Sequence, residues 1–169
     1  MRNERKLPMK SMYGLEIQCA DDKPQYFQNL LLQMKQIASI FDVDDNLLIA
    51  NTAMEAKVVK NMLADRCILE ETYVLSLLEN PIASSLFTDY GFITEKNNHF
   101  LYQDMVSIFR IESGRQEDIN MFLIQLEESI IAMEEQYKKS YIIDKEHKEY
   151  IIKVAKAYDI EVSFFDLDK

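Results

Sequence analysis

Residues 37–48, IASIFDVDDNLL, decide the fold that the sequence predicts. An apolar run, IASIF, leads directly into the acidic residues Asp42, Asp44 and Asp45. The run either continues the helix before it or forms a short buried strand that ends at Asp42, because short apolar runs fit both. A strand favours an α/β protein, and a helix favours a mostly α protein with a small sheet.

The sequence on either side alternates between helix and strand patterns. Residues 13–20 alternate apolar and polar side chains, which is typical of a strand. Thr52 and Glu55 form a capping box, which predicts that a helix begins there. The expected helices span about 24–38, 52–67, 69–79, 117–139 and 144–158, with a short one that can begin at Pro81 and stop at Gly91, and the expected strands span 13–20, 37–41, 92–94, 99–102, 105–112 and 160–165.

Strands that alternate with helices predict an α/β fold, a three-layer Rossmann-like sheet with a helical insertion. The insertion, at about 52–105, is expected to cover the carboxyl edge of the sheet like a lid. Residues 1–12 are predicted to be a basic flexible arm, and residues 13–169 a single α/β domain. The alternative fold is mostly α with a small sheet.

Composition places the chain among globular proteins. Apolar residues make up 48% and charged residues 28% of its 169 residues, and only 3 are glycine. No run of 18 apolar residues is present, so no membrane span is expected. The two cysteines, Cys19 and Cys67, fit neither a disulfide framework nor a zinc site, which indicates reduced thiols and a cytoplasmic protein.

The charge is strongly asymmetric. Residues 1–12 carry +3, whereas the whole chain carries −10 and its remainder therefore −13. An acidic body repels phosphate backbones, which excludes general nucleic-acid binding. The same charge attracts a basic protein partner.

Polar residues follow three of the expected strands. Asp42 and Asp44 follow IASIF, Ser113 follows VSIFRIE, and Asp166 and Asp168 follow IEVSFF. In open α/β sheets, sites form at the carboxyl ends of strands, so these residues are expected to converge. Carboxylate oxygens gathered in this way suit Mg²⁺.

Four segments resemble motifs of the haloacid dehalogenase-like phosphatase superfamily. IFDVDDNLL (40–48) is similar to its first motif, a strand followed by Asp-x-Asp, and RIESGRQEDI (110–119) to its second. Lys145 or Lys148 stands where the third motif has a lysine, and VSFFDLD (162–168) resembles the acidic fourth motif.

The resemblance implies a Mg²⁺-dependent phosphohydrolase that acts on a small phosphate ester through an aspartyl-phosphate. Asp42 would be the nucleophile and Asp44 the general acid/base. Ser113 and Lys145 would bind the transferring phosphoryl group. Asp42, the backbone carbonyl of Asp44, and Asp166 or Asp168 would hold the metal.

A second interpretation needs no catalysis. The acidic residues around Asp42 also fit a capping turn between two helices. An acidic, helix-rich domain of this size suits an adaptor, an inhibitor or an immunity-type protein that binds a basic partner. The apolar stripe of residues 117–139 either packs on the chain's own sheet or pairs with a second copy to give a homodimer.

Overall fold

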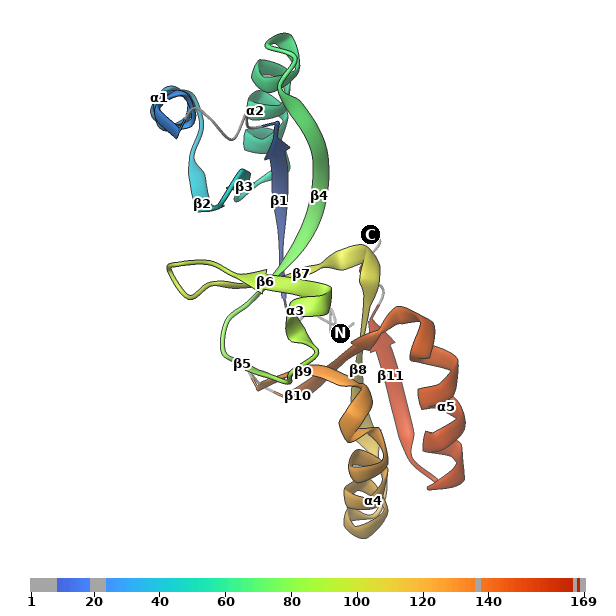
Figure 1. Cartoon of the computed structure of the whole chain (residues 1–169). Coiled ribbons are helices and arrows are strands. Elements are labelled where there is room, and N and C mark those ends of the chain that lie inside the picture. The colour runs from blue at the N-terminus through green and yellow to red at the C-terminus, as the bar shows by residue number, and fades with distance from the viewer. Residues whose placement is uncertain (1–8, 19–23, 136–137, 166, 168–169) are drawn as a thin grey trace. The chain divides into compact units, whose positions relative to one another are not determined.

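The computed structural model of the chain describes residues 9–18, 24–135, 138–165 and 167 (Figure 1). These residues divide into two units. The N-terminal unit consists of Ser11–Leu77 and Ile93–Asn98, and the C-terminal unit of Leu78–Phe92 and His99–Lys169 together with the start of the chain up to Lys10. The basic arm expected at residues 1–12 lies mostly outside the described residues.

The N-terminal unit follows a β-α-β-β-α-β succession. Its elements are β1 (Lys10–Ile17), α1 (Pro24–Ile37), β2 (Ile40–Asp44), β3 (Leu47–Ala50), α2 (Ala53–Asp65) and β4 (Leu69–Leu78). The strands stand in the order β2-β3-β1-β4, and β3 pairs antiparallel with both β1 and β2. The Thr52 hydroxyl accepts a hydrogen bond from the Glu55 backbone N–H, so the predicted capping box is confirmed.

Both helices of this unit cover the same face of its sheet. Leu15 on β1 stands opposite Leu48 on β3, and the two side chains point to the same side. The helices complete the cluster with apolar side chains at helical spacing. Its fully buried members are Leu15, Ile17, Leu30, Met34, Leu48, Ala50, Val59 and Leu63.

The C-terminal unit contains a second sheet. Its elements are β5 (Pro81–Ala83), α3 (Phe87–Tyr90), β6 (Gly91–Ile93), β7 (His99–Tyr102), β8 (Val106–Ser113), α4 (Gln116–Leu126), β9 (Ile130–Glu135), β10 (Lys139–Asp144), α5 (Lys148–Ala157) and β11 (Glu161–Phe165), with 3-10 turns at Gln103–Met105, Glu127–Ser129 and Lys145–His147. Its five strands stand in the order β11-β8-β10-β9-β5, and all these neighbours pair antiparallel.

This second sheet is buried on both faces. Tyr141 and Ile143 pack with Phe109 against α4 and α5, whereas Ile142, between them in sequence, joins the cluster on the opposite face. Aromatic rings fill the helical side: the ring centroids of Phe109 and Tyr141 are 5.2 Å apart, and those of Phe109 and Phe122 are 6.2 Å apart. Such pairs add about 0.5–1.5 kcal/mol beyond the area that they bury.

The two units share one topology. From β8 to β11 the C-terminal unit repeats the β-α-β-β-α-β succession, and its order β11-β8-β10-β9 matches β4-β1-β3-β2. In each repeat the first and third strands lie in the middle of the sheet and the second and fourth flank them. This is the arrangement of the ferredoxin-like, or split β-α-β, motif.

The predicted Rossmann-like sheet with a helical insertion is therefore wrong. Both sheets are antiparallel, and helix and strand make up about 40% and 41% of the described residues, so the mostly α alternative is wrong as well. A parallel sheet needs a crossover between neighbouring strands, but β2 and β3 join directly as a hairpin, and β9 and β10 pair antiparallel with only three residues between them in sequence. The segment 52–105 contributes α2 and then several strands rather than a helical lid.

The element predictions failed mainly where a strand looked like a helix. The helix expected at 69–79 is β4, and the helix expected at 117–139 ends at Leu126 and is followed by β9. The helix and strand interpretations of residues 37–41 are each partly correct, because α1 ends at Ile37 and β2 begins at Ile40. The strands at 105–112 and 160–165 and the helix at 144–158 are confirmed to within a few residues.

Candidate functional site

The acidic segment that suggested a catalytic loop forms a β-hairpin in the N-terminal unit. Asp42 lies within β2, and Asp45, with φ of 46°, turns the chain into β3. Asp and Asn tolerate this left-handed conformation better than most residues. Asn46 holds the turn against β1: its side-chain amide donates to the Ile17 carbonyl at 2.9 Å, and the Ile17 N–H donates to the Asn46 carbonyl at 2.9 Å.

Asp42 is buried and hydrogen-bonded through both of its oxygens. Only 3% of the residue is exposed, and it pairs with Ile49, which places it on the sheet face opposite α1 and α2. Its Oδ2 accepts from Thr94 Oγ1 and from Asn98 Nδ2, both at 2.7 Å. Its Oδ1 accepts from the Val43 N–H at 2.9 Å and lies 3.4 Å from Lys96 Nζ.

The partners of Asp42 come from one tight turn, Thr94–Asn98. The Thr94 N–H donates to the Asn98 carbonyl at 3.0 Å, and the Asn98 N–H donates to Thr94 Oγ1 at 3.3 Å. Asn97, with φ of 63°, closes the turn. Because these bonds are internal to the turn, Thr94 and Asn98 are preorganised as donors, and Asp42 anchors the turn to β2.

The pKa values of Asp42 and Asp44 shift in opposite directions. Burial raises the pKa of Asp42, but the hydrogen bonds from Asn98, Thr94 and Val43 and the charge of Lys96 outweigh it, so the net pKa is lowered. The pKa of Asp44 is raised, first by burial and then by the negative charges of Asp45, Asp42 and Glu95.

The geometry around Asp42 does not suit a magnesium ion. Oxygens that already accept hydrogen bonds from two side chains and one backbone N–H have little capacity left for a cation. Nor do the residues that the structure describes contain a group of three or more His, Cys, Asp or Glu side chains placed to hold a metal. Two of the four predicted metal ligands, Asp166 and Asp168, lie outside the described residues, so the Mg²⁺ expectation stays a prediction.

The other two predicted catalytic residues belong to the C-terminal unit. Ser113 ends β8 and donates through its hydroxyl to Glu161 Oε2 at 3.0 Å. Lys145 follows Asp144, which pairs with Val106 at the start of β8. The two residues therefore stand at opposite ends of an eight-residue strand, about 23 Å apart along it. The predicted convergence relied on parallel strands.

A second buried carboxylate escaped the sequence analysis. Glu134 on β9 is 1% exposed, and its Oε1 accepts from the Glu79 N–H at 2.6 Å. Its Oε2 is buried and has no hydrogen-bond partner among the described residues. Burial raises the pKa of Glu134, and the backbone hydrogen bonds from Glu79 and Asn80 offset part of that effect.

Comparisons with known proteins do not assign the chain to a family. No family model matches the chain, and neither a curated protein nor a solved structure matches it. Among the described residues, no helix is both long and apolar enough to cross a membrane. The resemblance to the haloacid dehalogenase-like superfamily stays a prediction.

Proposed function

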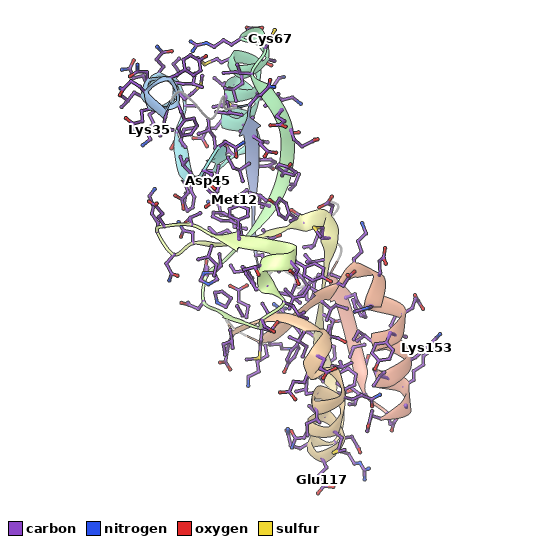
Figure 2. All side chains as sticks on the ribbon, viewed as in Figure 1. Met12, Lys35, Asp45, Cys67, Glu117 and Lys153 are labelled. Carbon is purple, nitrogen blue, oxygen red and sulfur yellow. The ribbon has the colours of Figure 1, made fainter. Side chains whose placement is uncertain are left out.

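We propose that the chain is a non-catalytic module that binds a basic protein partner through α4. One observation carries the proposal: Met121 and Ile124 on α4 are 52% and 63% exposed, although both are large and apolar. Figure 2 shows Glu117 projecting near the start of this helix. Adjacent exposed apolar side chains with a charged border are typical of an interaction surface.

The stripe has a defined charge pattern. Glu117, Met121, Ile124 and Glu128 follow one another at steps of four, three and four, so they lie along one side of the helix and the turn after it. Both glutamates are exposed. A partner that presents apolar side chains between lysines or arginines matches this pattern, with burial supplying affinity and charge supplying specificity.

The same pattern disfavours the homodimer expected through residues 117–139. Two antiparallel copies of α4 would set Glu117 of one against Glu128 of the other, and like charges repel. The helix is also shorter than expected, because it ends at Leu126. A basic partner is therefore the better match to this surface.

Asp42 gives further support to a non-catalytic function. A carboxylate nucleophile needs an oxygen that can approach phosphorus, whereas both oxygens of Asp42 accept hydrogen bonds and the residue is 3% exposed. The phosphohydrolase prediction has its own test, namely turnover of a generic phosphate ester with Mg²⁺ that disappears in Asp42→Asn. Such turnover would overturn the proposal.

The binding proposal is tested with a defined probe. A fluorescein-labelled amphipathic helical peptide of leucine and lysine is titrated with the full chain, and anisotropy is measured at low and high salt. We expect binding that weakens with ionic strength and falls at least about tenfold in the Met121→Gln/Ile124→Gln double variant.

A matched control exists on α2. Met54 and Val58 are 79% and 39% exposed, but Lys57 and Lys60 lie beside them. The Met54→Gln/Val58→Gln double variant therefore removes as much exposed apolar surface without touching an acidic stripe, and binding of the peptide should not change. Equal losses in the two double variants, or no salt dependence, would contradict the proposal.

A further inference from the structure

The N-terminal unit contains an open groove of about 470 Å³ between α2 and the strands β1 and β4. Small-molecule sites commonly enclose about 300–1,000 Å³, so the groove has the volume of such a site. All of its described lining residues belong to this unit, and Asp42 is not among them. Its lining residues are Tyr13, Gly14, Leu15, Ala53, Ala56, Lys57, Lys60, Asn61, Thr72, Tyr73 and Val74.

Small and apolar side chains create the space. On the α2 side the groove is lined by Ala53 and Ala56, whose small side chains leave space beside the helix. Leu15 lines the β1 side. Val74 on β4 remains 47% exposed although it is β-branched and apolar. An apolar group in the groove would remove this surface from water at roughly 25 cal/mol per Å².

The charged groups of the groove are all positive. Lys57 and Lys60, three residues apart on α2, line it together, and among the described residues no carboxylate does, although the chain has 29 acidic and 19 basic residues. Neither lysine forms an ion pair within the described part of the chain. Glu55, two residues before Lys57 on α2, is engaged instead by the Thr52 cap.

We infer that this groove binds a small amphipathic carboxylic acid. Its hydrocarbon part would lie against Leu15, Ala56 and Val74, and its carboxylate would pair with Lys57 and Lys60. The pairing of charges is complementary: two lysines beside apolar surface attract an anion with an apolar body and disfavour a cation of the same length. The inference goes beyond the proposed protein binding and does not depend on it.

The test uses three probes that separate the two halves of the recognition. Decanoate carries chain and charge, decanol carries the chain alone, and acetate carries the charge alone. Isothermal titration calorimetry of the full chain, below the aggregation limit of each probe, should give a dissociation constant for decanoate at least tenfold below that for decanol, and no measurable binding of acetate.

Variants then locate the site. The Lys57→Gln/Lys60→Gln double variant should weaken decanoate binding at least tenfold and bring it to the level of decanol. Val74→Glu places a negative charge at an exposed position of the wall and should also weaken decanoate at least tenfold. Lys35→Gln on α1, an exposed lysine of the same unit outside the groove (Figure 2), is the matched control and should bind as the wild type does.

Several results would overturn the inference. Equal affinity for decanoate and decanol would show that the lysines do not recognise a carboxylate. Equal loss in Lys35→Gln and in the Lys57→Gln/Lys60→Gln double variant would show a general effect of charge. Tighter binding of an acidic apolar peptide than of decanoate would replace the small molecule by a peptide. Circular dichroism melts of each variant establish that a loss of binding is not a loss of fold.

Discussion

The two units have the same topology, and each contains a buried carboxylate, but the two carboxylates differ in their hydrogen-bond partners. Asp42 lies on β2 and Glu134 on β9, the second strand of each β-α-β-β-α-β succession. Every oxygen of Asp42 accepts a hydrogen bond, whereas Glu134 has one oxygen without a partner among the described residues. The pKa of Asp42 is lowered and that of Glu134 is raised. Donors, rather than burial alone, decide the direction in which the pKa of a buried carboxylate moves.

The cores of the units differ as well. Leucine, isoleucine, valine, methionine and alanine fill the cluster beneath α1 and α2, whereas Phe109, Phe122 and Tyr141 dominate the cluster beneath α4 and α5. One topology is therefore satisfied by two unrelated sets of side chains, because what it requires is an apolar face of about the right volume.

The largest expected effect comes from removing an aromatic ring in the C-terminal core. Phe122→Ala, at a fully buried position, should lower the free energy of unfolding by about 3–5 kcal/mol, since it removes the contact with Phe109 and leaves a cavity. Hydrogen exchange should show the greatest loss of protection in β8, β10 and β11. Leu63→Ala, equally buried beneath α2, should cost about 2–5 kcal/mol and affect β1 and β3 most. The reverse pattern would contradict the division into two cores.

The next effect concerns Asp42. Asp42→Ala should cost about 3 kcal/mol, because Thr94 and Asn98 would be left as buried or half-buried donors without their acceptor. Lys96 contributes little to this value, since its side chain is 66% exposed. Chemical denaturation at neutral pH measures the loss. Asp44→Asn is the matched control and should be neutral or slightly stabilising, because it relieves repulsion from Asp42, Asp45 and Glu95.

The pH dependence of the Asp42 contribution has a definite sign. Its pKa in the folded chain lies below the ordinary value of 3.8, so the stabilisation is present above that value and is lost as the pH falls through the lowered pKa. The difference between wild type and Asp42→Ala should therefore be constant from neutral pH down to about pH 5 and shrink in more acidic solution. A difference that grows with acidity would contradict this account of the hydrogen bonds.

Local signals predicted much of the secondary structure. The capping box of Thr52 and Glu55, the strand at 105–112 and the helix at 144–158 all depend on residues close in sequence, and the structure confirms them. The failures share a cause, namely apolar residues that recur at helical spacing in a segment that is a strand. In β4, Leu69, Tyr73 and Leu77 keep a helical spacing although the segment is extended, and only Thr72, Tyr73 and Val74 favour a strand by type.

The candidate site depended on information that no single segment contains. The sequence identifies Asp42 as a candidate, but its partners Thr94 and Asn98 are more than fifty residues away, in a turn next to the expected strands 92–94 and 99–102. The predicted convergence of Ser113 and Lys145 requires a parallel sheet, and the antiparallel order of the observed sheet separates the two residues. Residue types indicated where chemistry was available, and strand direction decided which residues meet.

The smallest expected effect belongs to Glu134. Glu134→Gln keeps an oxygen that accepts from the Glu79 N–H and removes the buried negative charge. It should raise the free energy of unfolding at pH 7 by less than about 1 kcal/mol, since the new amide N–H₂ is buried in place of an oxygen that also had no described partner. Glu135→Gln, at the next, exposed position, is the matched control and should change stability little, because its pair with Lys139 at 3.7 Å is a surface contact.

The sign of its pH dependence is opposite to that of Asp42. The pKa of folded Glu134 is raised above the ordinary value of 4.5, so the folded chain binds this proton more tightly than the unfolded chain does. The stabilisation that protonation of Glu134 gives the fold is therefore fully present below pH 4.5 and is lost as the pH rises through the raised pKa. Glutamine does not titrate, so the advantage of Glu134→Gln should grow from acidic to neutral pH and then stay constant. Denaturant melts of wild type and variant at matched pH values measure this. An advantage that is largest in acid would show that the pKa of Glu134 is lowered, as that of Asp42 is, and that its second oxygen has a donor.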